Sequence, residues 1–286
     1  MTKYLLKLHA AILLGACSGI FAKLIPLDAP VISFYRMALA AVMLAVIFLA
    51  RRQSLTLDRT AWKSVATGGV LAIHWMMFYA SIKYSNVSVG VVCFTLSGFF
   101  TACLSPLFNR TRLSITELGL SSLTIAGILL IFSFDTAMRT GIILGVVSAF
   151  LFAVYAILNG RVNKVLPPLT NTLLQMSGGA VVLLPMTYLA ASGPAVGSVG
   201  NLGLLSLLAL CCTVAMCLLL NRSQERISPF TVSLSFNLEP VYSIFLAILI
   251  FHEDEQLGLS FYVGLSLIVL SLVLQTLRSR RAVEAV

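Results

Sequence analysis

The stretch from Ile227 to Phe251, ISPFTVSLSFNLEPVYSIFLAILIF, is almost entirely apolar and carries Leu238-Glu239-Pro240 at its centre. At the rise of an α-helix, roughly 18 Å of chain lies on either side of Glu239, so the stretch can cross a bilayer and the carboxyl falls near the midplane. A carboxylate at that depth costs roughly 2.5 to 3.5 kcal/mol and usually faces a bundle interior or a wet cavity. Glu239 is therefore the first candidate for a functional residue.

The composition of the whole chain is that of a polytopic membrane protein. Hydrophobic residues make up 59% of the 286 residues, charged residues make up 10%, and the mean hydropathy is +1.01. No soluble domain of this size would tolerate such a composition. Charge clusters and Gly, Pro and Asn turns divide the sequence into ten apolar segments, with boundaries defined to about three residues. The predicted spans are Leu5–Ile25, Pro30–Ala50, Ser64–Ile82, Val87–Phe108, Ser114–Phe134, Gly141–Asn159, Leu169–Ala191, Leu202–Leu220, Ile227–Phe251 and Leu257–Leu277.

The basic residues test this division independently. With both termini in the cytoplasm, fifteen of the nineteen Lys and Arg residues lie at cytoplasmic positions. Lys23, Lys83 and Arg139 fall outside, and Arg36 lies within a span. This asymmetry follows the positive-inside rule and predicts an all-α membrane protein with ten transmembrane helices and cytoplasmic termini. Basic loops facing an anionic leaflet also explain the net charge of +9, so no nucleic-acid partner is expected.

The ten spans divide into two sets of five, on either side of a short link around Asp135 to Thr140. Because five is odd, the second set must enter the membrane in the opposite orientation, as in an inverted repeat. We therefore expect one repeat in residues 1–135 and a second in residues 136–286. Sliding the fourth span onto the ninth places Gly98-Phe99 against Glu239-Pro240, so the first copy lacks the acid and the proline.

Two other titratable residues lie inside predicted spans. Arg36 lies near the outer end of the second span, where it either snorkels to the headgroups or provides a cationic contact for an anionic substrate group or an acidic partner. His74 lies near mid-membrane in the third span. It is either a neutral histidine hydrogen-bonded between helices or a residue that carries protons or binds substrate.

Further candidates come from the sixth and ninth spans. Tyr155 is one, because aromatic hydroxyls commonly line substrate cavities. The ninth span has a polar stripe with a spacing of three, four, four and three residues, formed by Ser228, Thr231, Ser235, Glu239 and Tyr242. Pro240 predicts a kink in this span and a role as a hinge. The structural alternative for Glu239 is a protonated carboxyl that joins helices through a hydrogen bond.

Other kinds of site are not indicated. The six cysteines all lie in predicted spans without a spacing typical of a disulfide or a metal site. His252-Glu253-Asp254-Glu255 is interpreted as a solvated outer loop rather than a metal site, because no further ligands converge on it. No Gly-rich Lys-Ser/Thr nucleotide-binding sequence occurs, which argues against direct coupling to ATP. No cofactor is expected.

The order of several short motifs resembles the EamA-type branch of the drug/metabolite transporter superfamily. The motifs are Phe34-Tyr35-Arg36, the turn from Ser81 to Ser85, Leu238-Glu239-Pro240-Val241 and the acid in Ile250-Phe251-His252-Glu253. The resemblance covers essentially the whole chain. It implies two inverted five-helix repeats around a central cavity, alternating access and movement of small metabolites, often outward.

These features predict a secondary transporter of the inner (plasma) membrane for a small polar metabolite, such as an amino acid, in the direction of export. The expected cavity residues are His74, Tyr155, Glu239, Tyr242, Ser235 and Arg36, with Pro240 as the hinge and no catalytic residue. The expected partners are the substrate, the bilayer and a proton as a candidate coupling ion, in a monomer or a homodimer. The rival classes are an intramembrane enzyme, which needs a paired nucleophile and base or a metal cluster, and a scaffold or sensor with a dry core.

Overall fold

The computed structural model describes residues 2–109, 115–134, 137–190, 195–219 and 238–284, and these ranges fold into helices without any strand. The elements are α1 (Thr2–Leu24), α2 (Ala29–Ala50), α3 (Arg59–Tyr84), α4 (Val87–Phe94), α5 (Ser97–Asn109), α6 (Ile115–Phe134), α7 (Arg139–Val162), α8 (Pro168–Leu189), α9 (Val199–Ala209), the π-helix η1 (Leu210–Ala215), α12 (Glu239–Phe251), the 3-10 helix η2 (Glu253–Gln256) and α13 (Leu259–Glu284). Seven helical stretches among the described residues are long and apolar enough to cross a membrane, and α12 and Leu259–Ser271 are shorter apolar helices.

The helix starts follow from local sequence. The Asp58 side chain accepts a hydrogen bond from the Ala61 N–H at 2.8 Å, so α3 begins several residues before the predicted Ser64. The Asn86 side chain caps α4 through the Val89 N–H, also at 2.8 Å. Proline occupies the first turn of α2, α8 and α12, where its missing N–H costs no helical hydrogen bond.

In the fourth and ninth predicted spans, a described helix begins part-way along the span. The fourth predicted span, Val87–Phe108, is confirmed as one candidate membrane span, and a turn at Thr95–Leu96 inside it separates α4 from α5. In the ninth, α12 begins at Glu239, and residues 227–237, including Ser228, Thr231 and Ser235, lie outside the described residues. When Gly98-Phe99 is aligned with Glu239-Pro240, the start of α5 falls within one residue of the start of α12.

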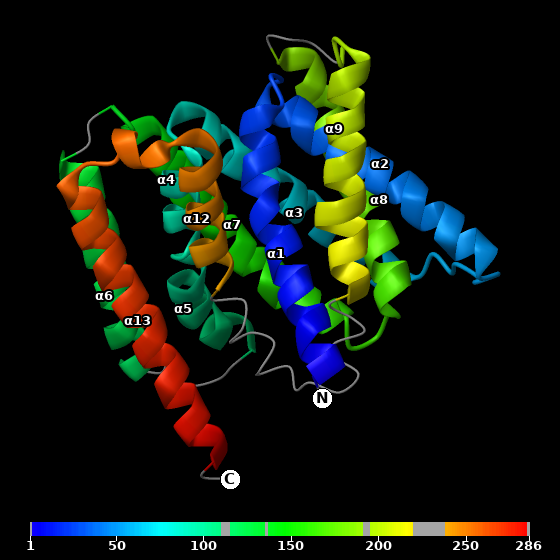
Figure 1. Ribbon diagram of the computed structural model, residues 1–286. Coiled ribbons are helices and arrows are strands. Elements are labelled where there is room, and N and C mark those ends of the chain that lie inside the picture. The colour runs from blue at the N-terminus through cyan, green and yellow to red at the C-terminus, as the bar shows by residue number, and fades with distance from the viewer. Residues whose placement is uncertain (1, 110–114, 135–136, 191–194, 220–237, 285–286) are drawn as a thin grey trace.

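The helices pack as one bundle with a separate pair at one side. α3 packs against α7 and α8, α2 packs against α8, and α1 packs against α12. α6 and α13 form the pair at the side of the bundle, and the two chain ends lie at the same end of the molecule (Figure 1). α3 also packs against α1, α2 and α4, and its polar Ser64, Thr67, His74 and Ser81 side chains are buried.

Glycines allow the closest of these helix contacts. A Cβ atom added at Gly68 of α3 would lie 2.1 Å from the carbonyl oxygen of Gln175 of α8. A Cβ atom at Gly178 would lie 2.4 Å from the carbonyl oxygen of Val65. Small residues at such positions let the backbones of two membrane helices touch. The contact between α3 and α8 therefore has no room for larger side chains.

Candidate functional site

Arg36 of α2 forms the centre of a buried polar cluster. Its Nε donates to the Thr213 hydroxyl at 2.9 Å, its Nη1 donates to the Ser18 hydroxyl at 2.7 Å and to the Tyr79 hydroxyl, and its Nη2 donates to the Cys212 carbonyl oxygen at 2.9 Å. The Ser18 and Tyr79 hydroxyls also bond each other at 2.9 Å. The guanidinium group thus joins four separate segments: α1, α2, α3 and η1.

The face of the guanidinium group is covered as well as its edge. Its central carbon lies 3.7 Å from the centroid of the Trp75 ring, a distance at which the ring face attracts a cation. Arg36 is 2% exposed, and every partner it has among the described residues is neutral. Of the two sequence interpretations, snorkelling to the headgroups is therefore wrong, because the side chain turns into the bundle.

Two of the partners of Arg36 lie in the π-helix η1. A π-helix bonds residue i to i+5, and such turns inside α-helices are rare and frequent at functional sites. η1 supplies both the Cys212 carbonyl oxygen and the Thr213 hydroxyl to Arg36. The sequence carried a signal for Thr213, which is the main polar residue inside its predicted span, but none for the π-helix.

Glu239 lies at the first turn of α12, against α1. One of its carboxyl oxygens would lie 3.3 Å from a Cβ atom at Gly15, and the Met216 sulfur approaches the same point. The charge of Arg36 acts on the Glu239 carboxyl without a direct ion pair between the two groups. A carboxylate in the first turn of a helix is stabilised by the partial positive charge there. The structure thus brings Arg36 and Glu239 into one electrostatic neighbourhood.

His74 lies in an aromatic cluster of α3, α4 and α7. Its Nδ1 is 2.9 Å from both the hydroxyl and the carbonyl oxygen of Ser148. The His74 ring lies 5.0 Å from the Phe152 ring and 5.5 Å from the Phe94 ring, centroid to centroid. Its residual exposure is 3%. These contacts fit the interpretation of a histidine held between helices, and the charge of Arg36 also reaches it.

Tyr155 lies on the other side of Phe152, where it borders a network of side-chain amides. Its hydroxyl donates to the Gln175 side-chain oxygen at 3.2 Å. The Gln175 amide donates to Asn159 at 2.7 Å and to Asn171 at 3.0 Å. These residues link α7 to α8 and were not predicted as a group, although each lies in a polar stretch of the sequence.

Tyr242 and Pro240 lie on α12 with Glu239. The Tyr242 hydroxyl is 3.3 Å from the Nδ1 of His9 on α1. Pro240 occupies the first turn of α12. The predicted residues that are described therefore lie in separate surroundings: Arg36 in its own polar cluster, His74 among aromatic rings, Tyr155 beside the amides of α7 and α8, and Glu239, Pro240 and Tyr242 together on α12.

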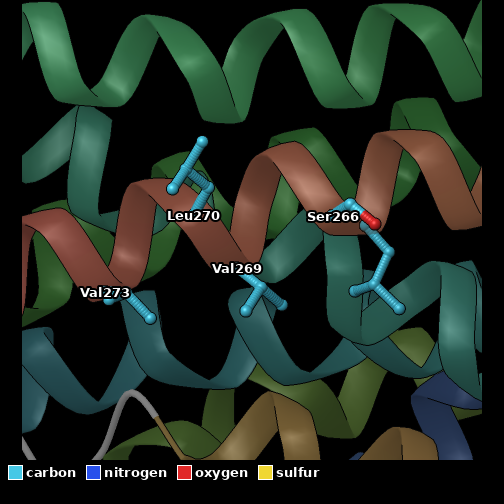
Figure 2. Close-up of a pocket in the computed structure, with 5 residues that line it drawn as sticks. Ser266, Val269, Leu270 and Val273 are labelled. Atoms are coloured by element: carbon cyan, nitrogen blue, oxygen red, sulfur yellow. The ribbon is translucent and has the colours of Figure 1, made fainter.

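A pocket elsewhere in the molecule has no predicted residue in it. It measures about 430 Å³ and is lined by Leu265, Ser266, Val269, Leu270 and Val273, all on α13. Figure 2 shows four of these side chains on one side of α13. Its lining is almost wholly apolar. Across the described residues, no three His, Cys, Asp or Glu side chains converge as a metal site would require.

The sequence comparisons identify the family. The sequence model of the EamA-like transporter family matches residues 2–133 and 139–277. The chain belongs to this family. It is therefore a member of the drug/metabolite transporter superfamily, and the resemblance seen in the sequence is confirmed. EamA-type transporters with several membrane-spanning helices are multi-pass proteins of the plasma membrane.

A curated relative and a solved structure agree with this family. The protein described as the uncharacterized transporter YxxF of Bacillus subtilis (strain 168) is 24% identical over 195 residues, which is 65% of this chain and 62% of the relative. The match therefore spans less than two thirds of the relative's length. A protein of known crystal structure has the same fold, with a TM-score of 0.65, 17% identity and 99% of each chain covered. The family and the relative indicate a transporter rather than an enzyme.

Proposed function

We propose that this EamA-family protein is a secondary transporter that exports a small polar metabolite, an amino acid or a related compound, by alternating access and without direct use of ATP. The observation that carries this proposal is the pairing of a buried cation with a separate carboxylate inside the bundle. Arg36 has only neutral partners among the described residues, and Glu239 lies within reach of its charge without an ion pair. A zwitterionic substrate has a negatively charged group that matches Arg36 and a positively charged group that matches Glu239.

Each predicted residue has a role in this proposal. Glu239 orients the substrate amine or exchanges a proton, and Pro240 is the hinge at the start of α12. Arg36 fixes η1 and provides the positive field for an anionic group. His74 and Tyr155 bound the site from α3 and α7, and Tyr242 bounds it from α12; Ser235 is proposed from the sequence alone and lies outside the described residues.

The proposed architecture is ten transmembrane helices in two inverted five-helix repeats, residues 1–135 and 136–286, with both termini in the cytoplasm. Three observations support it. The family matches the chain in two ranges, 2–133 and 139–277. The two chain ends lie at one end of the bundle (Figure 1). The helix starts of α5 and α12 fall at aligned positions, as expected of discontinuous helices in repeated transporter halves.

Flux in proteoliposomes tests the proposal. Purified protein is reconstituted and loaded with single amino acids, and efflux is measured with and without a proton gradient. Glu239→Gln should lower efflux at least about tenfold while leaving membrane insertion intact, because the neutral amide cannot form an ion pair with an amine or release a proton. Glu255→Gln removes one negative charge at an exposed position and is the matched control. Undiminished flux in Glu239→Gln would overturn the role of Glu239, and an absence of amino-acid flux in the unmodified protein would overturn the substrate class.

A further inference from the structure

Glu253 is a fully buried carboxylate in a turn that the sequence predicted to be a solvated loop. Its exposure is 0%, whereas its neighbours Asp254 and Glu255 are exposed. The prediction was therefore wrong for this residue. The reason lies in His252, which ends α12 in the left-handed region with φ 53° and ψ 43°. That turn reverses the chain and directs the Glu253 side chain inward, between α1 and α4.

The carboxylate completes the cap of α4. One oxygen accepts from the Val87 N–H at 2.9 Å, and the other accepts from the Ser88 N–H at 2.8 Å and from the Ser88 hydroxyl at 2.7 Å. Asn86 satisfies the next two N–H groups, with its side chain on Val89 and its carbonyl oxygen on Gly90. The first four N–H groups of a helix lack intrahelical partners. Here side chains satisfy the three at Val87, Ser88 and Val89, two of them through a residue more than 160 positions away, and the Gly90 N–H makes the first bond within the helix.

Lys23 at the end of α1 closes the same cluster. Its ammonium group lies 2.9 Å from a Glu253 oxygen and 4.4 Å from the centroid of the Phe251 ring. One side chain from α1 is thus held by two residues at the end of α12. We name this cluster of Lys23, Val87, Ser88, Phe251 and Glu253 the α12 latch. It ties α1, α4 and α12 together at the end of the bundle away from the chain termini (Figure 1).

The latch is stable against protonation in the neutral range. Burial by itself raises the pKa of the Glu253 carboxyl, but the hydrogen bonds from Ser88 and Lys23 and from the backbone of Ser88 and Val87 outweigh it. The pKa of this carboxyl consequently lies below its ordinary value of 4.5. The carboxylate stays charged at physiological pH, so only a movement of the helices separates it from its partners.

We infer that the α12 latch is the outer gate of the transporter: its intact contacts hold the outer ends of α1, α4 and α12 closed, and their separation opens the site to the outside. This inference rests on alternating access in the proposed function. It follows from the position of the latch, since α12 begins at Glu239 and ends at Glu253's turn. A rigid movement of α12 that repositions Glu239 must therefore also move Glu253 relative to Lys23 and Ser88.

Cysteine accessibility tests the gate without any substrate. Val91, one turn beyond the latch on α4, is 3% exposed and faces Gly19 of α1. Val91→Cys is labelled from the outside with a membrane-impermeant maleimide, and the protein without this substitution gives the background of the native cysteines. Adding Glu253→Gln should accelerate labelling at least about tenfold, because removing the charge leaves Lys23 and the α4 N–H groups without their carboxylate.

Controls make the test decisive. Glu255→Gln, in the same turn but exposed, should leave the labelling rate unchanged. If Glu253→Gln does not fold, Ser88→Ala and Lys23→Met each remove one partner and should give a smaller acceleration. Folded variants that are labelled at the unmodified rate, with or without a loss of thermal stability, would overturn the gate and leave the cluster a structural cap. Because labelling needs no flux, a failed amino-acid assay with accelerated labelling would overturn the proposed substrate and leave the gate standing.

Discussion

The molecule buries two charges in opposite ways. Glu253 is surrounded by an opposite charge on Lys23 and by a helix N-terminus, so its cluster is electrically complete. Arg36 is surrounded by hydroxyls, a carbonyl oxygen and an aromatic face, so its hydrogen bonds are made but no described residue pairs with its charge. The first arrangement suits a contact that must hold helices together, and the second suits a charge that acts on something else.

Because the two charges are buried differently, their removal should have different effects on thermal stability and on transport. Removing one member of a buried ion pair leaves the other unpaired, which costs about 3–5 kcal/mol. Removing a cation whose partners are neutral leaves groups that can bond to one another, as Ser18 and Tyr79 already do. We therefore expect loss of the outer cluster to lower thermal stability strongly, and loss of the central one to lower transport with little loss of stability.

The largest effect on stability should come from Glu253→Gln. We expect the midpoint of thermal unfolding in detergent to fall by about 5–10 °C relative to Glu255→Gln, because the ammonium group of Lys23 and the α4 N–H groups lose their carboxylate. Fluorescence-detected gel filtration after heating measures this midpoint. A fall of the same size in both variants would mean that the buried Glu253 contributes no more to thermal stability than the exposed Glu255.

Arg36→Met should have a small effect on thermal stability and a large effect on transport. Methionine fills much of the same apolar volume, so the unfolding midpoint should change by less than about 3 °C, while flux in proteoliposomes should fall at least about tenfold. Arg36→Lys should not restore flux, since an ammonium group cannot reproduce the planar fork or the stacking on Trp75. Full flux in Arg36→Lys would contradict the role of the guanidinium geometry.

Lowering the pH should remove the stabilisation by the α12 latch within a defined pH range. Because the pKa of Glu253 is lower in the folded protein than its ordinary value of 4.5, its contribution is fully present above that value and is lost as the pH falls through the lower folded pKa. The difference in unfolding midpoint between the unmodified protein and Glu253→Gln should therefore be constant from about pH 5 to 8 and shrink below about pH 4.5. Taking the difference cancels the other carboxyls. A difference that already shrinks near pH 6 would contradict the lowered pKa.

The smallest effect should come from the turn that aims Glu253. His252→Val should cost about 1–2 kcal/mol, because a β-branched residue is strained at φ 53°. His252→Gly should be neutral or slightly stabilising at the same position. Thermal unfolding of the two variants in parallel compares them. Equal midpoints would show that the left-handed turn is not what positions the latch.

Hydropathy and charge were enough to place most spans, because apolar length and loop charge are properties of the local sequence. The described helices match the predicted spans to within a few residues for α1, α2 and α6. The costs of burying charge also singled out Arg36 and Glu239. The partners of these groups were not predictable, since Arg36 bonds Thr213 and Glu253 bonds Ser88 across more than 160 positions. The acids at 253–255 look alike in sequence, and only the packing of α1 and α4 separates the buried one from its exposed neighbours.

The π-helix η1 acts as a one-residue insertion in an otherwise regular rod. One extra residue in a turn rotates everything after it by about 100° relative to a continuous α-helix. A helical wheel drawn through 202–220 therefore assigns the residues beyond η1 to the wrong side. Loss of a single residue there would straighten the rod and withdraw the Cys212 carbonyl oxygen and the Thr213 hydroxyl from Arg36 while the other partner side chains stayed unchanged. A change of one residue in the length of η1 would thus change the surroundings of Arg36 without any substitution of the side chains around it.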